Sequence, residues 1–130
     1  MEEPANDVSL SEMQLSVMRV LWSKQSATVA EVVAALRGTR LLAHTTVATV
    51  LNRLEKRQLV ESWRDGRQLV FRALASEEQV QRSMVTGLVS NLFSGSAGEL
   101  MSYLLRSKDV DSDDLAKIRA MLDSNGDGND

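Results

Sequence analysis

The chain has 130 residues, of which 43% are hydrophobic and 25% charged, and its formal net charge is −3. These values are typical of a soluble globular protein with one domain, or with one domain and a smaller appendage. The sequence has no cysteine, which excludes disulfides, zinc–thiolate sites and thiol chemistry, and no stretch approaches the ~18 consecutive apolar residues of a membrane span.

The charges are unevenly distributed along the chain. Residues 1–75 carry ten Lys or Arg and eight Asp or Glu, whereas residues 76–130 carry five and ten. Residues 37–72 contain eight basic and three acidic residues. A basic stretch inside an acidic chain favours a polyanion-binding face, and an ordinary solvated surface is the alternative.

The N-terminal part begins with two predicted helices. Residues 1–8 are acidic and lack the apolar core of a signal peptide, so we expect a flexible N-terminus on a cytoplasmic protein. Ser11 with Gln14, and Thr28 with Glu31, have the spacing of capping boxes. Each pair precedes an apolar stripe at helical spacing, which predicts a helix after each.

The third predicted helix, HTTVATVLNRLEKRQLV, begins at His44. At ~100° per residue, one side of it collects the apolar residues Val47, Val50, Leu51 and Leu54. The opposite side collects Thr45, Thr49, Asn52 and Lys56, flanked by Thr46, Ala48 and Arg53. A helix in the DNA major groove needs such a surface, because short polar groups reach base edges and cations further along meet phosphates.

A β-hairpin is predicted after the third helix. Apolar and polar residues alternate on both sides of Asp65-Gly66, a dipeptide typical of tight hairpin turns. The hairpin fits as the wing of a winged helix-turn-helix domain spanning residues 9–75, with Arg64 and Arg67 bracketing its tip. Trp63 lies on the strand before the tip, where the dimer partner and DNA sugar are its two candidate contacts.

Residues 76–122 predict three further helices. Ser76 with Gln79 and Ser96 with Glu99 cap two of them, and Asp111 or Ser112 begins the third. Short amphipathic helices do not bury their stripes alone, so we expect a dimerisation region; packing onto the same chain's first domain is the alternative. The residues assigned to the dimer interface are Val85, Leu88, Val89, Leu92, Leu100, Met101, Leu104, Leu105, Leu115, Ile118 and Leu122.

Four segments, MQLSVMRVLW, TVAEVVAAL, AHTTVATVLNRLEKRQLV and RDGRQLVFRA, together with the C-terminal helices resemble the penicillinase-repressor family of the BlaI/MecI type. The resemblance runs from Val8 to Leu122. It implies a winged-helix domain, a helical dimerisation region and repression by binding a palindromic operator. It also implies release from DNA when a membrane-bound sensor system triggers proteolysis of the dimerisation region. By similarity, the DNA contacts are His44, Thr45, Thr46, Thr49, Asn52 and Arg53 on the recognition helix and Arg67 on the wing.

The sequence departs from that family pattern in two places. The antibiotic-resistance members are cut at an Asn–Phe bond in the second C-terminal helix. The matching place here is near Tyr103-Leu104, and the chain contains no Asn–Phe pair; Asn91-Leu92, in the preceding helix, is the nearest equivalent. Copper-responsive relatives bind the metal through a cysteine cluster, which this chain lacks.

The sequence gives little support for a metal site or for an enzyme active site. The tail DSNGDGND imitates the start of a calcium loop but ends at its eighth position, so we expect residues 123–130 to be a disordered tail. His44 is the only histidine, placed either near a helix cap or against DNA, and no nucleophile-elbow motif accompanies it. We therefore predict no enzyme, no cofactor and no bound metal.

The sequence thus predicts a mainly α protein with a small β-hairpin, acting as a dimeric, sequence-specific bacterial transcriptional repressor. Its expected partners are double-stranded DNA, a second copy of the chain and an inducing protease, without membrane insertion. Thr45, Thr46, Thr49 and Asn52 are assigned to bases, and Arg53, Lys56, Arg64 and Arg67 to phosphates, although Arg53 lies where a base contact is also open. The alternatives are a winged-helix module that binds protein, and a repressor with a small molecule between its dimer helices.

Overall fold

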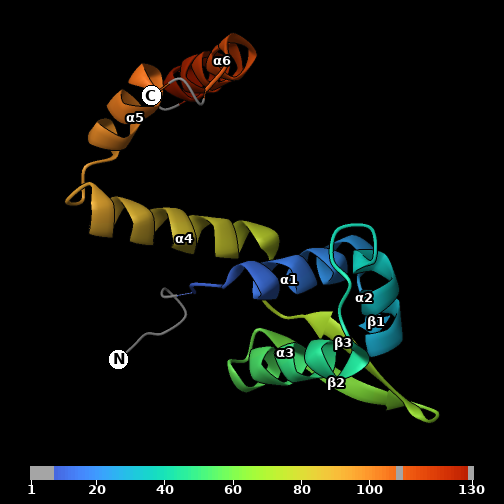
Figure 1. The fold of residues 1–130 in the computed structure, drawn as a ribbon. Coiled ribbons are helices and arrows are strands. Elements are labelled where there is room, and N and C mark those ends of the chain that lie inside the picture. The colour runs from blue at the N-terminus through green and yellow to red at the C-terminus, as the bar shows by residue number, and fades with distance from the viewer. Residues whose placement is uncertain (1–7, 108–109, 129–130) are drawn as a thin grey trace. The chain divides into compact units, whose positions relative to one another are not determined.

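The computed structural model describes residues 8–107 and 110–128 (Figure 1). The chain divides into two units, Met1–Gly87 and Leu88–Asp130. The N-terminal unit contains α1 (Glu12–Lys24), β1 (Ala27–Thr28), α2 (Val29–Leu36), α3 (His44–Lys56), β2 (Val60–Asp65) and β3 (Gln68–Ala73). The helix α4 (Glu77–Leu92) begins in this unit and ends in the next, which also holds α5 (Ala97–Arg106) and α6 (Ser112–Gly128).

The predicted capping boxes are confirmed. At the start of α1, Ser11 Oγ accepts from the Gln14 amide at 3.1 Å, and Gln14 Oε1 accepts from the Ser11 amide at 3.2 Å. Thr28 and Glu31 exchange the same pair of bonds at the start of α2, at 3.2 and 2.8 Å. These side chains satisfy backbone donors that have no partner inside the first helical turn, which is why both helices begin where the sequence indicates.

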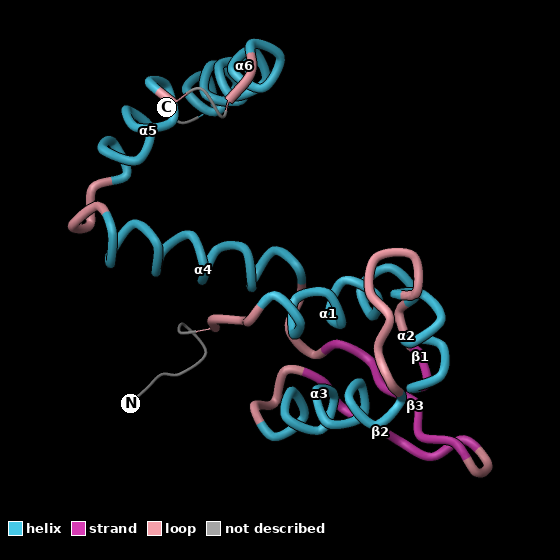
Figure 2. The backbone as a smooth tube through the Cα atoms, in the orientation of Figure 1, coloured by secondary structure: helices cyan, strands magenta, loops and turns pink. Residues whose placement is uncertain are grey.

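A three-stranded antiparallel sheet, in the order β1-β3-β2, completes the N-terminal unit (Figure 2). The hairpin is confirmed, with Val60 opposite Ala73 at its base and Asp65 opposite Gln68 at its end. The sequence places Asp65-Gly66 in the turn, whereas the two loop residues are Gly66 and Arg67. Gly66 has a φ of +67°, which a two-residue hairpin turn requires and glycine adopts without a steric penalty.

The strand β1 is an element that the sequence did not predict. It has only two residues, with Ala27 opposite Phe71 and Thr28 opposite Val70 on β3. Thr28 is also the N-cap of α2 and has the extended backbone that both roles need. Two residues are too few to show an alternating pattern, so only the pairing with a distant strand reveals the element.

The core of the N-terminal unit draws on every helix and strand of that unit. Its largest fully buried side chains are Phe71, Met18, Leu21, Leu51, Leu54, Val17, Val32, Val47, Val60 and Val80. The last of these belongs to α4, so the first turns of that helix pack on the winged-helix core. Figure 1 shows the hairpin turn extending beyond the helices of this unit.

The C-terminal unit is helical. Ser96 Oγ caps α5 by accepting from the Glu99 amide at 3.1 Å, and Asp111 Oδ1 accepts from the Asp114 amide at 2.8 Å before α6. We expected the last helix to end at Leu122, whereas α6 continues to Gly128. Residues 123–128 contain no proline, and each glycine in a helix costs only about 1 kcal/mol. Nothing in this segment therefore forces the helix to end at Leu122. None of the helices in the described ranges is long and apolar enough to span a membrane.

Candidate nucleic-acid interface

The helix α3 is anchored by one face and free on the other. Val47, Leu51 and Leu54 have no exposed surface, and Val50 is also buried, as the periodicity predicts. The opposite face holds the exposed side chains of His44, Thr45, Thr49, Asn52, Arg53 and Lys56, and Thr46 is half-buried at its edge. The packed face fixes the helix, and the free face presents short polar groups first and cations later.

The hydroxyl of Thr49 is already engaged within the helix. Its Oγ1 donates to the carbonyl oxygen of Thr45 at 2.9 Å. The hydrogen is therefore committed to the backbone, and the side chain offers its methyl group and oxygen lone pairs to a partner. The sequence could not show this bond, because a threonine at this spacing adopts more than one rotamer in a helix.

The start of α3 differs from the starts of the other helices. Its N-cap position is Ala43, and no side chain accepts a hydrogen bond from its first turn. Ser, Thr or Asp side chains cap the other helices. The open amides and the positive end of the helix dipole favour a negatively charged group here. The signal was in the sequence, since Ala-His stands where the other helices have a capping residue.

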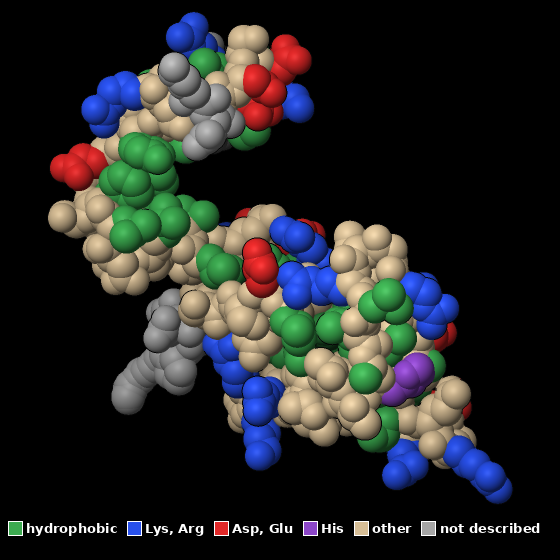
Figure 3. All heavy atoms as spheres, in the orientation of Figure 1, with side chains coloured by type: hydrophobic (Ala, Val, Ile, Leu, Met, Phe, Trp, Pro, Cys, Tyr) green, Lys and Arg blue, Asp and Glu red, His purple; other side chains and the backbone are tan. Residues whose placement is uncertain are grey.

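Four exposed cations, two on α3 and two on the hairpin, lack acidic partners. Arg53 and Lys56 lie on α3, Arg64 on β2 and Arg67 in the hairpin turn, and all are exposed. Within the part of the chain that the structure describes, none of the four forms an ion pair. Figure 3 shows Lys and Arg side chains at the projecting hairpin tip and near one end of α3. Unpaired cations in these places suit a polyanion.

Two side-chain hydrogen bonds fix α3 against its neighbours. Ser62 Oγ on β2 donates to Glu55 Oε2 at 2.7 Å, which joins the helix to the hairpin. Arg57 Nη1 donates to Gln14 Oε1 at 3.1 Å, which joins the end of α3 to the start of α1. The C-terminal part of α3 is therefore tied to both β2 and α1.

Trp63 lies on the face of the hairpin that carries Glu61 and Arg72. Trp63 is 41% exposed. The Arg72 guanidinium stands 5.9 Å from the ring centroid, within cation–π range, and also pairs with Glu61 on the opposite strand. These contacts hold the indole in place; its contact with DNA or a second chain stays a prediction.

The residues assigned to dimerisation lie on helices with little cover in the single chain. Val85, Leu88, Leu92 and Leu105 are exposed, and the half-buried ones are Val89, Leu100, Met101, Leu104, Leu115 and Ile118. Leu122 lies outside the residues whose side chains are described. Between residues 88 and 121, none of the described side chains is buried. The described residues also contain no cluster of His, Asp or Glu that could hold a metal ion.

A family model described as penicillinase repressor matches residues 10–124. The transcriptional regulator BlaI of Mycobacterium tuberculosis is 37% identical over 123 residues, which cover 92% of this chain and 88% of that protein. The penicillinase repressor of Staphylococcus aureus is 17% identical over 88% of this chain and 91% of its own length.

Solved structures agree on the fold. The DNA-binding domain of the repressor BlaI matches with a TM-score of 0.50 and 28% identity, over 61% of this chain and 93% of that one. A MarR family protein from Bacillus stearothermophilus, 20% identical, matches with a TM-score of 0.50 over 88% of this chain and 76% of that one. The family model covers most of the chain and a relative exceeds one-third identity over nearly the same span. The chain therefore belongs to the penicillinase repressor family, a family of winged-helix transcriptional repressors and not of enzymes.

Proposed function

We propose that this protein represses transcription in the cytoplasm by binding, as a homodimer, a palindromic DNA operator. The observation that carries the proposal is the free face of α3. Short polar side chains precede cations there, beside an uncapped helix start and a hairpin tip with unpaired arginines. A relative named as a transcriptional regulator and a structural neighbour titled as a repressor DNA-binding domain support it.

In this proposal α3 enters the major groove, and Thr45, Thr46, Asn52 and the methyl group of Thr49 meet base edges. Because the Thr49 hydrogen is donated to its own helix, Thr49 does not donate to a base, and the contact that we propose is from its methyl group to a thymine methyl group. His44 lies at the uncapped first turn, where phosphate is the favoured partner. Arg53, Lys56, Arg64 and Arg67 contact the backbone and set the position of the domain on the duplex.

The C-terminal helices supply the dimer in this proposal. Two copies place two α3 helices on half-sites related by the same two-fold axis, which gives a palindromic operator. Release then follows an inducing signal that breaks the dimer. If that signal is proteolysis near Tyr103-Leu104, the cut falls inside α5, so this helix must open locally before cleavage.

The proposal is tested by selecting an operator from random DNA and titrating binding against salt. Wild type should select a palindrome and lose affinity steeply as salt rises, whereas a protein-binding module would select none. Because a homodimer carries Arg67 twice, Arg67→Gln should reduce the salt slope by about 2, and the matched Arg82→Gln, on α4, should leave it unchanged.

Changes in DNA sequence preference distinguish the proposed base contacts from the proposed phosphate contacts. Asn52→Ala should relax the preference at one position of each half-site by about 1–3 kcal/mol. Thr49→Val keeps the methyl group and removes the hydroxyl, so the selected operator should stay the same. An altered operator with Thr49→Val would show that the hydroxyl, and not the methyl group, reads the base.

A further inference from the structure

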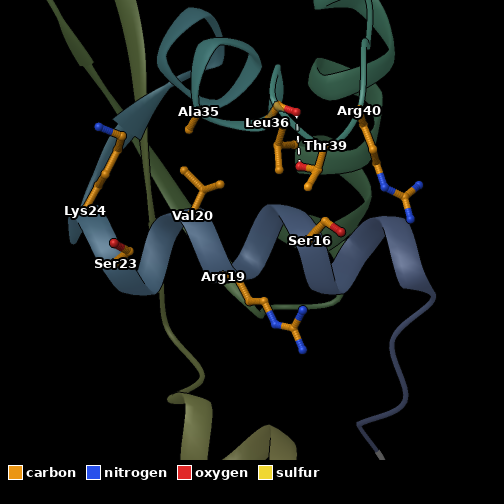
Figure 4. A pocket seen from close by; sticks show the side chains of 9 residues that line it. All are labelled: Ser16, Arg19, Val20, Ser23, Lys24, Ala35, Leu36, Thr39 and Arg40. Carbon is orange, nitrogen blue, oxygen red and sulfur yellow. Dashed lines mark hydrogen bonds between the residues drawn. The ribbon is translucent and has the colours of Figure 1, made fainter.

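A hollow in the N-terminal unit lies apart from the α3 face. It has a volume of about 570 Å³ and is formed by α1, α2 and the turn that leads from α2 to α3 (Figure 4). Its size is within the range of small-molecule sites. The lining residues are Ser16, Arg19, Val20, Ser23, Lys24, Ala35, Leu36, Thr39 and Arg40.

The charged residues that line the hollow are all cations. Lys24 and Arg40 stand at its two ends, and Arg19 lies on its rim, pointing away from the floor (Figure 4). In the described part of the chain neither Lys24 nor Arg19 has an acidic partner. Arg40 pairs with Glu12 at 3.3 Å, but the Glu12 side chain is 92% exposed, so this ion pair is weak and open to exchange.

The floor between these cations is apolar. Val20 on α1 and Ala35 on α2 point toward one another, with Leu36 beside them (Figure 4). Two of the hydroxyls are already donors to the backbone, Thr39 to Leu36 O at 3.2 Å and Ser16 to Glu12 O at 3.0 Å. The other donors in the lining are the neutral Ser23 hydroxyl and the three cations, and the cations favour a charged acceptor over a neutral polar one.

We propose that this hollow binds a small organic anion, with a carboxylate or phosphate group on an apolar body, and that its occupation weakens operator binding. The inference rests on the proposed function and goes beyond it. It places the ligand inside the winged-helix unit, whereas the sequence suggested a site between dimer helices.

The link to DNA binding follows from the position of Thr39 and Arg40. Both belong to the turn that ends where α3 begins, so a ligand held between α1 and this turn contacts the segment that carries the recognition helix. Its negative charge also offsets cations of a domain that attracts a polyanion. Both effects act in the same direction, toward weaker operator binding.

Binding is tested on the full-length protein by NMR titration with benzoate and phenyl phosphate, using benzyl alcohol as the neutral control. The two anions should produce saturable amide shifts in residues 16–24 and 35–40 at millimolar concentrations, and benzyl alcohol should produce none. Absence of saturable shifts with both anions, or equal shifts with benzyl alcohol, would overturn the proposal. The anion with the tighter binding identifies which head group the site prefers.

Matched variants place the site. Ala35→Leu fills the floor and should abolish binding, whereas Ala34→Leu, an exposed neighbour outside the lining, should leave it intact. Lys24→Gln should weaken binding about threefold, and Arg82→Gln, on α4, should not change it. Binding that survives Ala35→Leu would locate the ligand elsewhere and refute this site.

The regulatory part is tested with the selected operator. Benzoate or phenyl phosphate at saturation should lower operator affinity about two- to fivefold at constant ionic strength, and Ala35→Leu should remove this effect. Unchanged operator affinity at saturation would refute the effector role. Operator binding by the ligand-free protein is measured separately, so failure of the proposed function is distinguishable from failure of the site.

Discussion

Every buried apolar side chain among the described residues lies between Val8 and Val80, whereas α5 and the described side chains of α6 bury none. The sequence composition does not explain this difference, since α5 carries Leu100, Met101, Leu104 and Leu105 in a short span. The N-terminal unit closes its own core around one sheet and four helices. The C-terminal helices instead leave apolar side chains such as Leu92 and Leu105 exposed, and in the proposed homodimer a second copy of the chain covers them. A complete core and an incomplete one predict different responses to mutation.

The largest effect is expected in the closed core. Leu51 has no exposed surface, so Leu51→Ala should lower the free energy of unfolding by about 2–5 kcal/mol through lost burial and the cavity left behind. Denaturant unfolding at several protein concentrations measures it, and the loss should be the same at each. A loss that depends on concentration would mean that the partner subunit also supports this core.

The next largest effect is expected on dimerisation, through the exposed apolar side chains of α5. Leu105 is 53% exposed in the single chain, and Leu105→Asp should weaken dimerisation about 100-fold, since it carries an unpaired carboxylate into an apolar interface. Sedimentation equilibrium measures the dimer constant. Leu41→Asp, at a leucine 87% exposed in the N-terminal unit, is the matched control and should leave it unchanged. An unaffected dimer in Leu105→Asp would remove α5 from the interface.

A smaller loss of stability is expected where the N-terminal unit meets the segment before α4. Trp22 Nε1 donates to the carbonyl oxygen of Ala75 at 2.9 Å, which ties α1 to the segment before α4. Trp22→Phe should cost about 1–2 kcal/mol, because the carbonyl is left without this donor. Thermal unfolding measures the cost. Tyr103→Phe, in the C-terminal unit, is the control; its hydroxyl has no hydrogen bond within the described ranges, so little change is expected.

The smallest effect compares helix caps in the two units. Ser96→Ala removes the cap of α5 and Thr28→Ala that of α2, at about 0.5–1 kcal/mol each. In Ser96→Ala, hydrogen exchange should show faster opening of α5, and the increase should be larger at low protein concentration. In Thr28→Ala, it should show faster opening of α2 to the same extent at every protein concentration. If the exchange rates of both variants depended equally on protein concentration, the two units would not differ in their need for a second chain.

Local chemistry explains what was predictable from sequence. The capping pairs, the apolar side of α3 and the hairpin depend on residues within one or two turns of each other, and each was confirmed. The strand β1, the Arg57–Gln14 bond and the hollow beside Lys24 join segments far apart in the chain, and no local pattern encodes them. The Thr49 hydrogen bond is local, but it depends on a rotamer choice that the sequence does not determine.

One atom described above, Gln14 Oε1, accepts hydrogen bonds from both the Ser11 amide and the Arg57 guanidinium. The cap of α1 and the rear of α3 therefore share a single acceptor. Movement of α3 away from α1 breaks the bond from Arg57 and removes one of the two contacts that hold the Gln14 side chain. The bond from the Ser11 amide should then weaken, so solvent exchange of this amide should report motion of α3. A measurement at the first turn of α1 can thus follow the position of α3 without a probe on its free polar face.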